Sequence, residues 1–226
     1  NPTTLWNKLV HITNIVNLVF QNNFSCYFII NQNDQMNIIN SNAFDNFDSN
    51  DLTSFTPTFN NIINENNYDI GHVLSSGSGG RAYLNSLCAS NKGDGFTASP
   101  PTNDQIFVVD YLCHELGHQF GCNHIHQNCN NTSFSNFEPG SGSTIMAYTG
   151  ICAPNVQNES DPYFNRFNIW EAKQHIESTS CANEINHNNP IPSINNDYDN
   201  IIYNIPDNTS FELYADDITN INTSNE

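Results

Sequence analysis

The stretch His114-Glu-Leu-Gly-His118-Gln-Phe-Gly121-Cys-Asn-His124 carries the strongest signal in the chain. Residues four apart share one face of a helix, so His114 and His118 can present two imidazoles to one metal ion. Gly121 tolerates a positive φ, and the sharp turn that it allows returns His124 to the same ion. Three histidine ligands leave one coordination position open, which is typical of a catalytic zinc site. The spacing therefore predicts a catalytic Zn²⁺ held by these three histidines.

Glu115 supplies the group that chemistry at such a metal needs. It follows the first histidine directly, where its carboxylate can reach a metal-bound water and act as a general base. The frequencies of His, Glu and Gly in this chain give a random match to the whole motif on the order of 10⁻⁵. We therefore favour a metal site over ordinary helix histidines. His126 lies off the motif spacing. We therefore expect it to face solvent or to support a metal ligand, rather than to bind the metal itself.

A second motif, Ser143-Thr-Ile-Met146-Ala-Tyr148, follows the histidines. Together the two motifs resemble the zinc-binding sequence and downstream Met-turn of the metzincins. The resemblance implies that Met146 forms an apolar floor beneath the metal, although a plain core methionine is the alternative. Astacin-like and serralysin-like metzincins carry a tyrosine at the position of Tyr148. Its phenol could stabilise an oxyanion, or its ring could simply line the substrate pocket.

A closer resemblance is to the reprolysin-like metallopeptidases, especially their secreted bacterial members, over roughly residues 5 to 181. Snake-venom-type members have Asp after the third histidine, whereas this chain has Ile125. Besides the zinc motif, the resemblance is carried by five segments: Asn67-Tyr-Asp-Ile-Gly-His72, Gly80-Arg-Ala-Tyr-Leu-Asn-Ser-Leu-Cys88, Gly95-Phe-Thr97, Glu138-Pro-Gly-Ser-Gly-Ser-Thr-Ile-Met-Ala-Tyr-Thr-Gly-Ile-Cys152 and Asp161-Pro-Tyr-Phe164.

This resemblance implies an α+β metzincin fold. Its parts would be a twisted, mostly parallel sheet with an antiparallel edge strand, an active-site helix and an irregular lower subdomain. The edge strand would pair with an extended protein or peptide substrate. Its residues would be Gly80, Arg81, Ala82, Tyr83, Leu84 and Asn85. We expect a zinc endopeptidase, secreted or extracellular, that acts as a monomer.

The seven cysteines are an odd number, so at least one thiol is expected to be free. The resemblance pairs Cys88 with Cys181 and Cys129 with Cys152. Three thiols would remain: Cys26, Cys113 and Cys122. The last two lie inside or beside the zinc motif, where buried free thiols are a simpler interpretation than a metal or redox role.

The charge of the chain excludes one class of partner. Lys and Arg number 5 against 23 Asp and Glu, for a formal net charge of −18. Phosphate backbones would be repelled, so no nucleic-acid partner is expected. The carboxylates could hold Ca²⁺ or favour basic peptides, but a solvated acidic surface explains them equally. No apolar run is long enough to predict a membrane span.

Residues 1–186 are expected to form the catalytic domain. The fold should open with a strand, yet apolar spacing predicts a helix almost at once, so the domain would lack its first strand and the native protein would be longer. Residues 187–226 would be a linker or the start of an appended β-rich module. Periodicity and turn residues predict helices over 4–21, 58–65, 106–120 and 168–178, and strands over 25–30, 69–75, 201–205 and 210–214.

Two other functions share these residues. A catalytically silent zinc-binding interaction module would keep the fold and the metal, and a zinc amidase would use the same water on cell-wall peptides. Because Glu115 accompanies all three histidines, we favour the peptidase. The remaining histidines are expected to be ordinary: His11, His72, His175 and His187.

Overall fold

The computed structural model describes residues 2–34, 50–99, 103–129, 131 and 134–185, and two short strands beyond them. The chain divides into two units, Asn1–Ala182 and Asn183–Glu226. In the second unit, β4 (Ser193–Ile194) and β5 (Ile218–Thr219) pair antiparallel. The strands predicted over 201–205 and 210–214 lie outside the described residues. The boundary predicted between residues 186 and 187 stays a prediction.

Helix α1 (Pro2–Phe24) opens the first unit, as the apolar spacing over 4–21 predicted. Four apolar residues of one face are buried: Ile12, Val16, Val19 and Phe20. The ring of Phe20 is completely buried, and its centroid lies 4.9–5.6 Å from four other rings. Those rings belong to Phe24, Phe28, Phe120 and Phe164. This aromatic cluster joins α1 to the segments that flank the metal motif and the last helix.

The strand predicted over 25–30 is wrong, because residues 26–31 join no ladder in the described part of the chain. A helix side chain takes the place of a strand partner. The amide of Asn17 accepts a hydrogen bond from the backbone N–H of Phe28 at 2.7 Å and donates one to its carbonyl at 3.0 Å. Both backbone groups are therefore satisfied without a sheet.

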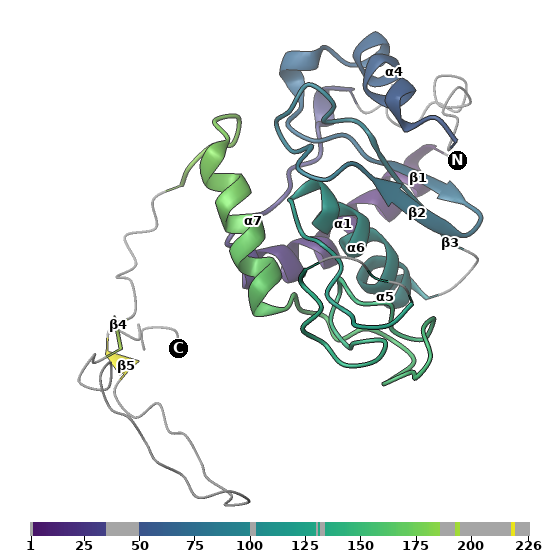
Figure 1. Ribbon diagram of the computed structural model, residues 1–226. Coiled ribbons are helices and arrows are strands. Elements are labelled where there is room, and N and C mark those ends of the chain that lie inside the picture. Colours follow the sequence, from purple (N-terminus) through teal and green to yellow (C-terminus); the bar gives the residue numbers. More distant parts are fainter. Residues whose placement is uncertain are drawn as a thin grey trace, which may run out of the picture. The chain divides into compact units, whose positions relative to one another are not determined.

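A small mixed sheet in the first unit lies between α4 above and α5 below in the view of Figure 1. It contains β1 (Val73–Ser76), β2 (Gly79–Ala82) and β3 (Gly95–Ser99) in the order β1-β3-β2. β1 runs parallel to β3, with Val73 opposite Phe96, whereas β2 runs antiparallel, with Arg81 opposite Phe96. The fold is thus α+β, with one parallel and one antiparallel pair among the described strands rather than a mostly parallel sheet.

Short helical segments precede the sheet: η1 (Gln32–Asp34), η2 (Leu52–Ser54), α4 (Phe55–Ile62) and η3 (Glu65–Asn67). α4 lies three residues earlier than the helix predicted over 58–65. The side chain of Asp51 accepts the N–H of Thr53 at the start of η2, which leads directly into α4. Pro57 then falls in the first turn of α4, where its missing N–H removes no helical hydrogen bond.

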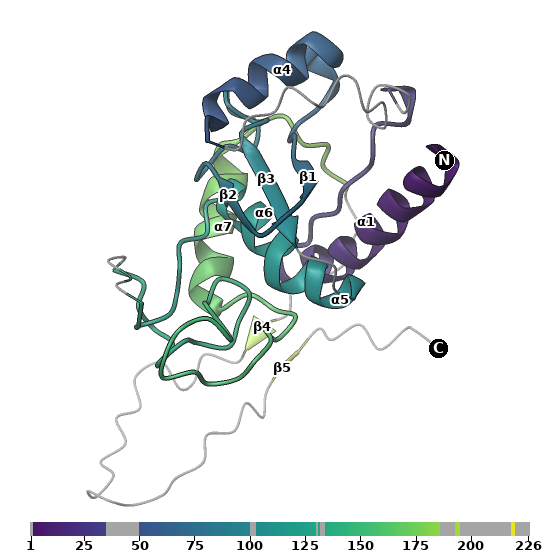
Figure 2. The same cartoon turned by 90° about the vertical axis from the view of Figure 1, so that its right-hand side faces the viewer.

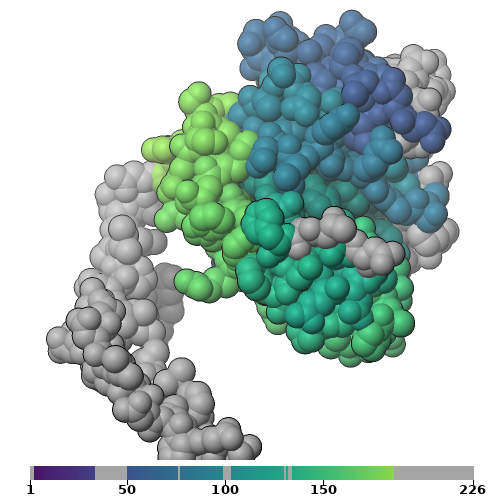
Figure 3. Space-filling model, viewed as in Figure 1, coloured from purple at the N-terminus to yellow at the C-terminus, as the bar shows by residue number. Residues whose placement is uncertain are grey.

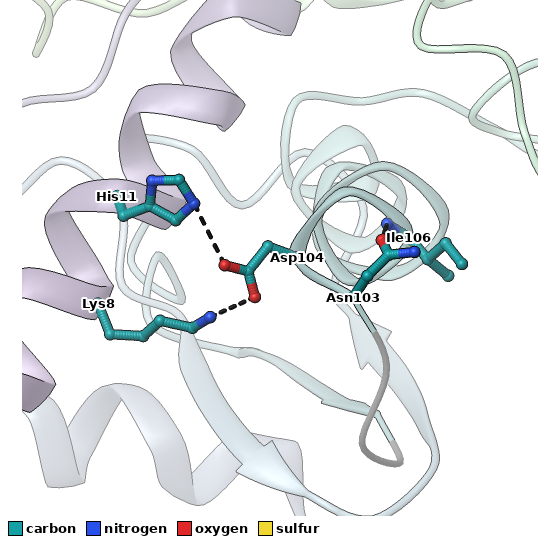
Figure 4. Close-up of polar contacts among 5 residues, drawn as sticks. All are labelled: Lys8, His11, Asn103, Asp104 and Ile106. Carbon is teal, nitrogen blue, oxygen red and sulfur yellow. Dashed lines mark hydrogen bonds and ion pairs between the residues drawn. The ribbon is translucent and has the colours of Figure 1, made fainter.

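The helix that carries the metal motif packs against the sheet (Figures 1 and 2). It consists of α5 (Asp104–Ile106), a π-helical segment η4 (Phe107–Leu112) and α6 (Cys113–Gln119). The side chain of Asn103 caps it by accepting the N–H of Ile106 at 2.8 Å. Figure 4 shows Asp104 in its first turn between Lys8 and His11 of α1. The helix therefore lies between the sheet and α1.

Residues 122–165 form the irregular lower part of the unit, below the sheet residues in Figure 3. Their described residues contain no helix or strand, only a bridge between His126 and Glu138. Helix α7 (Arg166–Ser178) follows and packs on α1. Disulfides join Cys88 to Cys181 and Cys129 to Cys152, with Cα–Cα distances of 5.7 Å in both. Within the described residues, no helix combines the length and the apolar character needed to cross a membrane.

Candidate metal centre

Three histidine side chains converge beside the sheet. α6 carries His114 and His118, and the loop after it brings His124 to them through Gly121, whose φ is +96°. The Nε2 atom of His124 lies 3.1 Å from the Nε2 atoms of both other histidines. A tetrahedral Zn²⁺ with Zn–N bonds of about 2.0–2.1 Å would place its ligand atoms about 3.3 Å apart. Both separations from His124 are therefore close to those in a tetrahedral zinc site, and all three ligand atoms lie within 4.8 Å of one another.

The protonation of these rings also suits a cation. The Nδ1–H of His114 donates to the carbonyl of Ile145 at 2.7 Å, and that of His118 donates to the carbonyl of Cys122 at 2.8 Å. Since a carbonyl can only accept, both Nε2 atoms keep their lone pairs. Burial lowers the pKa of His118 to about 4, that of His124 to about 3, and that of His114 well below its ordinary value. At neutral pH the group is a set of neutral imidazoles, as metal binding needs.

Glu115 lies beside the histidines with its carboxyl group buried. Glu115 is 9% exposed, and this burial raises its pKa to about 8, because a buried carboxylate loses its hydration. A Cβ added to Gly80 of β2 would lie 2.6 Å from both Cγ and Oε1 of Glu115. The absence of a side chain at Gly80 is therefore what lets the carboxyl group rest against the edge of the sheet.

Gly117 has a matching role on the other side of the helix. A Cβ added there would lie 2.6 Å from the sulfur of Met146 and 2.8 Å from a ring carbon of Phe164. Met146 is completely buried beneath the helix. Sequence reasoning did not single out Gly117 for this contact. A glycine inside a helix destabilises the helix, so its presence in the motif could have indicated that a neighbouring group packs closely against this position.

Tyr148 and His126 form the wall next to the histidines. The ring of Tyr148 lies 4.6 Å from that of His124 and stacks on His126 at 4.3 Å, with 21° between the planes. Burial and the Glu115 carboxylate raise the pKa of Tyr148. His126 is 1% exposed and lies outside the metal-binding group. It supports the tyrosine ring, which in turn contacts one of the convergent histidines.

The two cysteines near the motif are buried and free. Burial raises the pKa of Cys113 and Cys122, so neither is a thiolate at neutral pH. The Sγ of Cys122 donates to the carbonyl of Asn168 at 3.4 Å. Neither belongs to the metal-binding group, and both act as small apolar core residues.

A cleft of about 620 Å³ runs past the histidines. β2 lines one side, and 147–151 with 158–160 line the other. Asp110 and Glu159 both line this cleft, and Asp110 accepts a hydrogen bond from the backbone N–H of Ser160 at 2.8 Å. Burial, and to a smaller extent the charge of Glu159, raises the pKa of Asp110. Among the described side chains, no Lys or Arg pairs with either carboxylate. The cleft therefore offers an acidic end near the metal-binding group.

Only part of the predicted substrate strand lines this cleft. Gly80, Arg81 and Ala82 do, and the strand ends at Ala82. The N–H of Tyr83 still donates to the carbonyl of Asp94 at 3.0 Å. Leu84 and Asn85 turn away and line a separate shallow groove against α7. Asn85 has φ +59°, and its N–H donates to the carbonyl of His118 at 3.1 Å, which anchors the strand end to α6.

The comparison with known protein families agrees with this geometry. The family model described as metallo-peptidase family M12B, reprolysin-like, matches residues 3–174. No curated protein matches the chain. The family match includes the sheet, the three convergent histidines, Glu115 and Met146. Because it covers well over half of the 226 residues, the chain belongs to the reprolysin-like M12B metallopeptidases.

Proposed function

We propose that the protein is a zinc-dependent endopeptidase in which His114, His118 and His124 hold the metal and Glu115 is the general base. One observation carries the proposal. Three neutral imidazoles, with Nε2 atoms 3.1 Å apart in two of the pairs, adjoin a buried carboxyl group in an open cleft. When bound, Zn²⁺ polarises the scissile carbonyl and lowers the pKa of a coordinated water to about 7.

Glu115 moves the proton. Its carboxyl group lies against Gly80 and lines the cleft together with the three histidines. Burial raises its pKa to about 8, and a nearby divalent cation would stabilise the ionised form and lower that value. Glu115 then accepts the proton of the attacking water and returns it to the leaving amine. No covalent enzyme intermediate is required.

The substrate binds along β2 and adds one more strand to the sheet. β2 is one of the two edge strands of the described three-stranded sheet, and its residues Gly79 to Ala82 line the cleft. Gly80 lets the Glu115 carboxyl group lie close to the strand with which an extended peptide backbone would pair, because no Cβ stands there. Main-chain hydrogen bonds at a sheet edge bind peptides with little regard to sequence.

Tyr148 has two candidate roles in this reaction. Its ring lies 5.9 Å from that of His114 and 4.6 Å from that of His124, next to where the substrate carbonyl would lie. The phenol could stabilise the oxyanion, a contribution of roughly 2.7–4 kcal/mol for comparable donors. Alternatively, the ring stacked on His126 only shapes the pocket. Tyr148→Phe separates them, because loss of an oxyanion donor lowers kcat well over tenfold while zinc content stays constant.

Peptide cleavage by the purified chain tests the function. Mass spectrometry of a peptide library, with and without a chelator, should show internal cuts that depend on metal. Glu115→Ala should retain zinc and lose cleavage by about 10²–10⁴. Zinc binding without cleavage in the natural chain would indicate an interaction module, and cleavage confined to cell-wall peptides would indicate an amidase. We also propose an extracellular location, since two disulfides persist best in an oxidising environment.

A further inference from the structure

Glu138 is a buried carboxylate with no place in the proposed reaction. It is 8% exposed and lies in the loops after the third histidine. Its Oε2 atom accepts the N–H groups of Ser143 at 2.8 Å and Thr144 at 3.1 Å. Its Oε1 atom accepts the hydroxyl of Thr144 at 2.6 Å and Nδ2 of Asn165 at 2.9 Å. Among the described residues, no Lys or Arg forms an ion pair with it.

The donors around Glu138 require an acceptor on both oxygens. Backbone N–H groups can only donate, so Oε2 cannot be replaced by an amide nitrogen. On the other side, Oδ1 of Asn165 accepts the N–H of Phe167 at 3.0 Å at the start of α7. That bond orients the amide so that its Nδ2 group faces Glu138. A carboxylate accepts hydrogen bonds from all four donors. A carboxamide would instead place its own NH₂ group against at least one of these donors.

The hydrogen bonds of Glu138 lead directly to a metal-ligand partner. Thr144 precedes Ile145, whose carbonyl accepts Nδ1–H of His114 at 2.7 Å. This bond selects the tautomer that leaves the Nε2 lone pair facing the other two histidines. The position of the Ile145 carbonyl therefore controls the orientation and protonation of the first ligand.

The main chain of Glu138 braces the segment that follows His124. Its N–H donates to the carbonyl of Ile125, and its own carbonyl accepts the N–H of Gln127, both at 2.9 Å. A Cβ added to Gly142 would lie 2.6 Å from Oε2 of Glu138, so a glycine makes room for the carboxylate. Glu138 thus connects the segment of the third ligand with the hydrogen-bond partner of the first.

We propose that Glu138 is a positioning residue of the metal centre, which holds Ser143 and Thr144 so that the Ile145 carbonyl fixes the metal-binding tautomer of His114. The proposal rests on the zinc site of the proposed function. Residues that support metal ligands typically contribute 10–100-fold in metal affinity. Because Glu138 acts through one intervening backbone group, we expect about tenfold.

The test uses the full chain with Glu138→Gln and two measurements that do not depend on turnover. Competition with a chelator should show zinc binding weakened about tenfold. Long-range ¹⁵N–¹H NMR spectra of the metal-free protein should show the proton of His114 on Nδ1 in the natural chain, and shared between both nitrogens in the variant. Unchanged zinc affinity with an unchanged tautomer would overturn the proposal.

Asp94→Asn is the matched control. Asp94 is 4% exposed, and its Oδ1 accepts the N–H and hydroxyl of Thr56 at 2.8 and 2.7 Å, as Glu138 accepts those of Thr144. Asp94→Asn should lower the melting temperature without changing zinc affinity. The same result for Glu138→Gln would make Glu138 merely structural. If that variant does not fold, Thr144→Val decides, since zinc affinity equal to that of the natural chain would refute the proposal.

Peptide cleavage by the natural chain is recorded in the same series. A natural chain that binds zinc but cuts no peptide would refute the peptidase function and leave the test of Glu138 intact. A natural chain that cuts peptides, with zinc affinity and tautomer unchanged in Glu138→Gln, would refute only the role of Glu138.

Discussion

Two regions of the first unit are ordered by different means. The helix-and-sheet region, residues 2–34 and 50–121, has a core of apolar side chains and regular backbone hydrogen bonds. The loop region, residues 122–165, has no helix or strand among its described residues. Turns and single polar side chains fix its backbone, such as Asn128 on the carbonyl of Ala153 and Ser135 on the carbonyl of His124, both at 2.8 Å. The loop region adds six residues to the apolar core that it shares with the first region: Cys122, Ile125, Ile145, Met146, Ala147 and Phe164.

This difference separates two contributions to the site. The helix-and-sheet region provides His114, His118 and Glu115 on a packed helix, where their spacing is a property of the helix itself. The loop region provides His124, Met146, Tyr148 and the acceptor of His114. Loss of one apolar contact should therefore weaken the whole unit, whereas loss of one polar contact in the loops should disturb the site first.

The largest expected effect is on the aromatic cluster. Phe20→Ala removes a completely buried ring that contacts four others. It should lower the free energy of unfolding by about 3–5 kcal/mol, measured by denaturant titration. Zinc affinity of the remaining folded protein should not change. A variant with normal stability and weakened zinc binding would contradict the division between the two regions.

The next effect concerns the disulfide of the loop region. Cys129 and Cys152 are separated by 23 residues, so replacing both with Ser should cost about 3 kcal/mol through loop-closure entropy. Because the loops hold part of the site, activity should fall at a lower temperature than the helical circular dichroism signal. Coincident loss of both signals would show that the two regions unfold as one.

Gly80→Ala tests the contact between the sheet edge and the proposed base. The added Cβ would lie 2.6 Å from the Glu115 carboxyl group, and overpacking of this kind costs about 1–3 kcal/mol. If that strain displaces the base, kcat should fall about ten- to hundredfold, with zinc content unchanged. Gly79→Asn is the control, since nothing lies within 4 Å of a Cβ there and Asn tolerates the φ of +84°. Equal losses in both variants would argue against displacement of Glu115.

The smallest expected effect is on the ion cluster that joins α1 to α5. The pKa of Asp104 is lowered mainly by the hydrogen bond from Lys8 and, to a smaller extent, by the positive charges of Lys8 and His11 (Figure 4). The Asp104 carboxylate contributes to the free energy of unfolding at pH values above its pKa in the unfolded chain. This contribution is lost as the pH falls through its lower pKa in the folded chain. Asp104→Asn should therefore be slightly less stable than the natural chain at neutral pH and equal to it in acid. A difference that persists in acid or resists high salt would reject an electrostatic origin.

Sequence reasoning succeeded best where a short-range pattern decides structure. The apolar spacing of α1, the start of the motif helix near residue 106 and the positive φ of Gly121 follow from local geometry, and the structure agrees. It failed for residues 25–30, where the apolar run met no strand partner and Asn17 bound the backbone instead. His72, expected to be ordinary, links Gln119 at 2.7 Å to Thr97 at 2.8 Å between helix and sheet.

The sequence by itself determined which residues share a helix face and where the chain turns back, because 3.6 residues per turn and the freedom of glycine act within a few positions. It therefore predicted His114, His118, His124 and Glu115 as one group. Only the tertiary structure decided that Gly80 makes room for Glu115 and that Glu138 holds the turn that contacts His114. These contacts join residues 35 and 24 positions apart, and their closeness depends on how the loops pack, which no local spacing specifies.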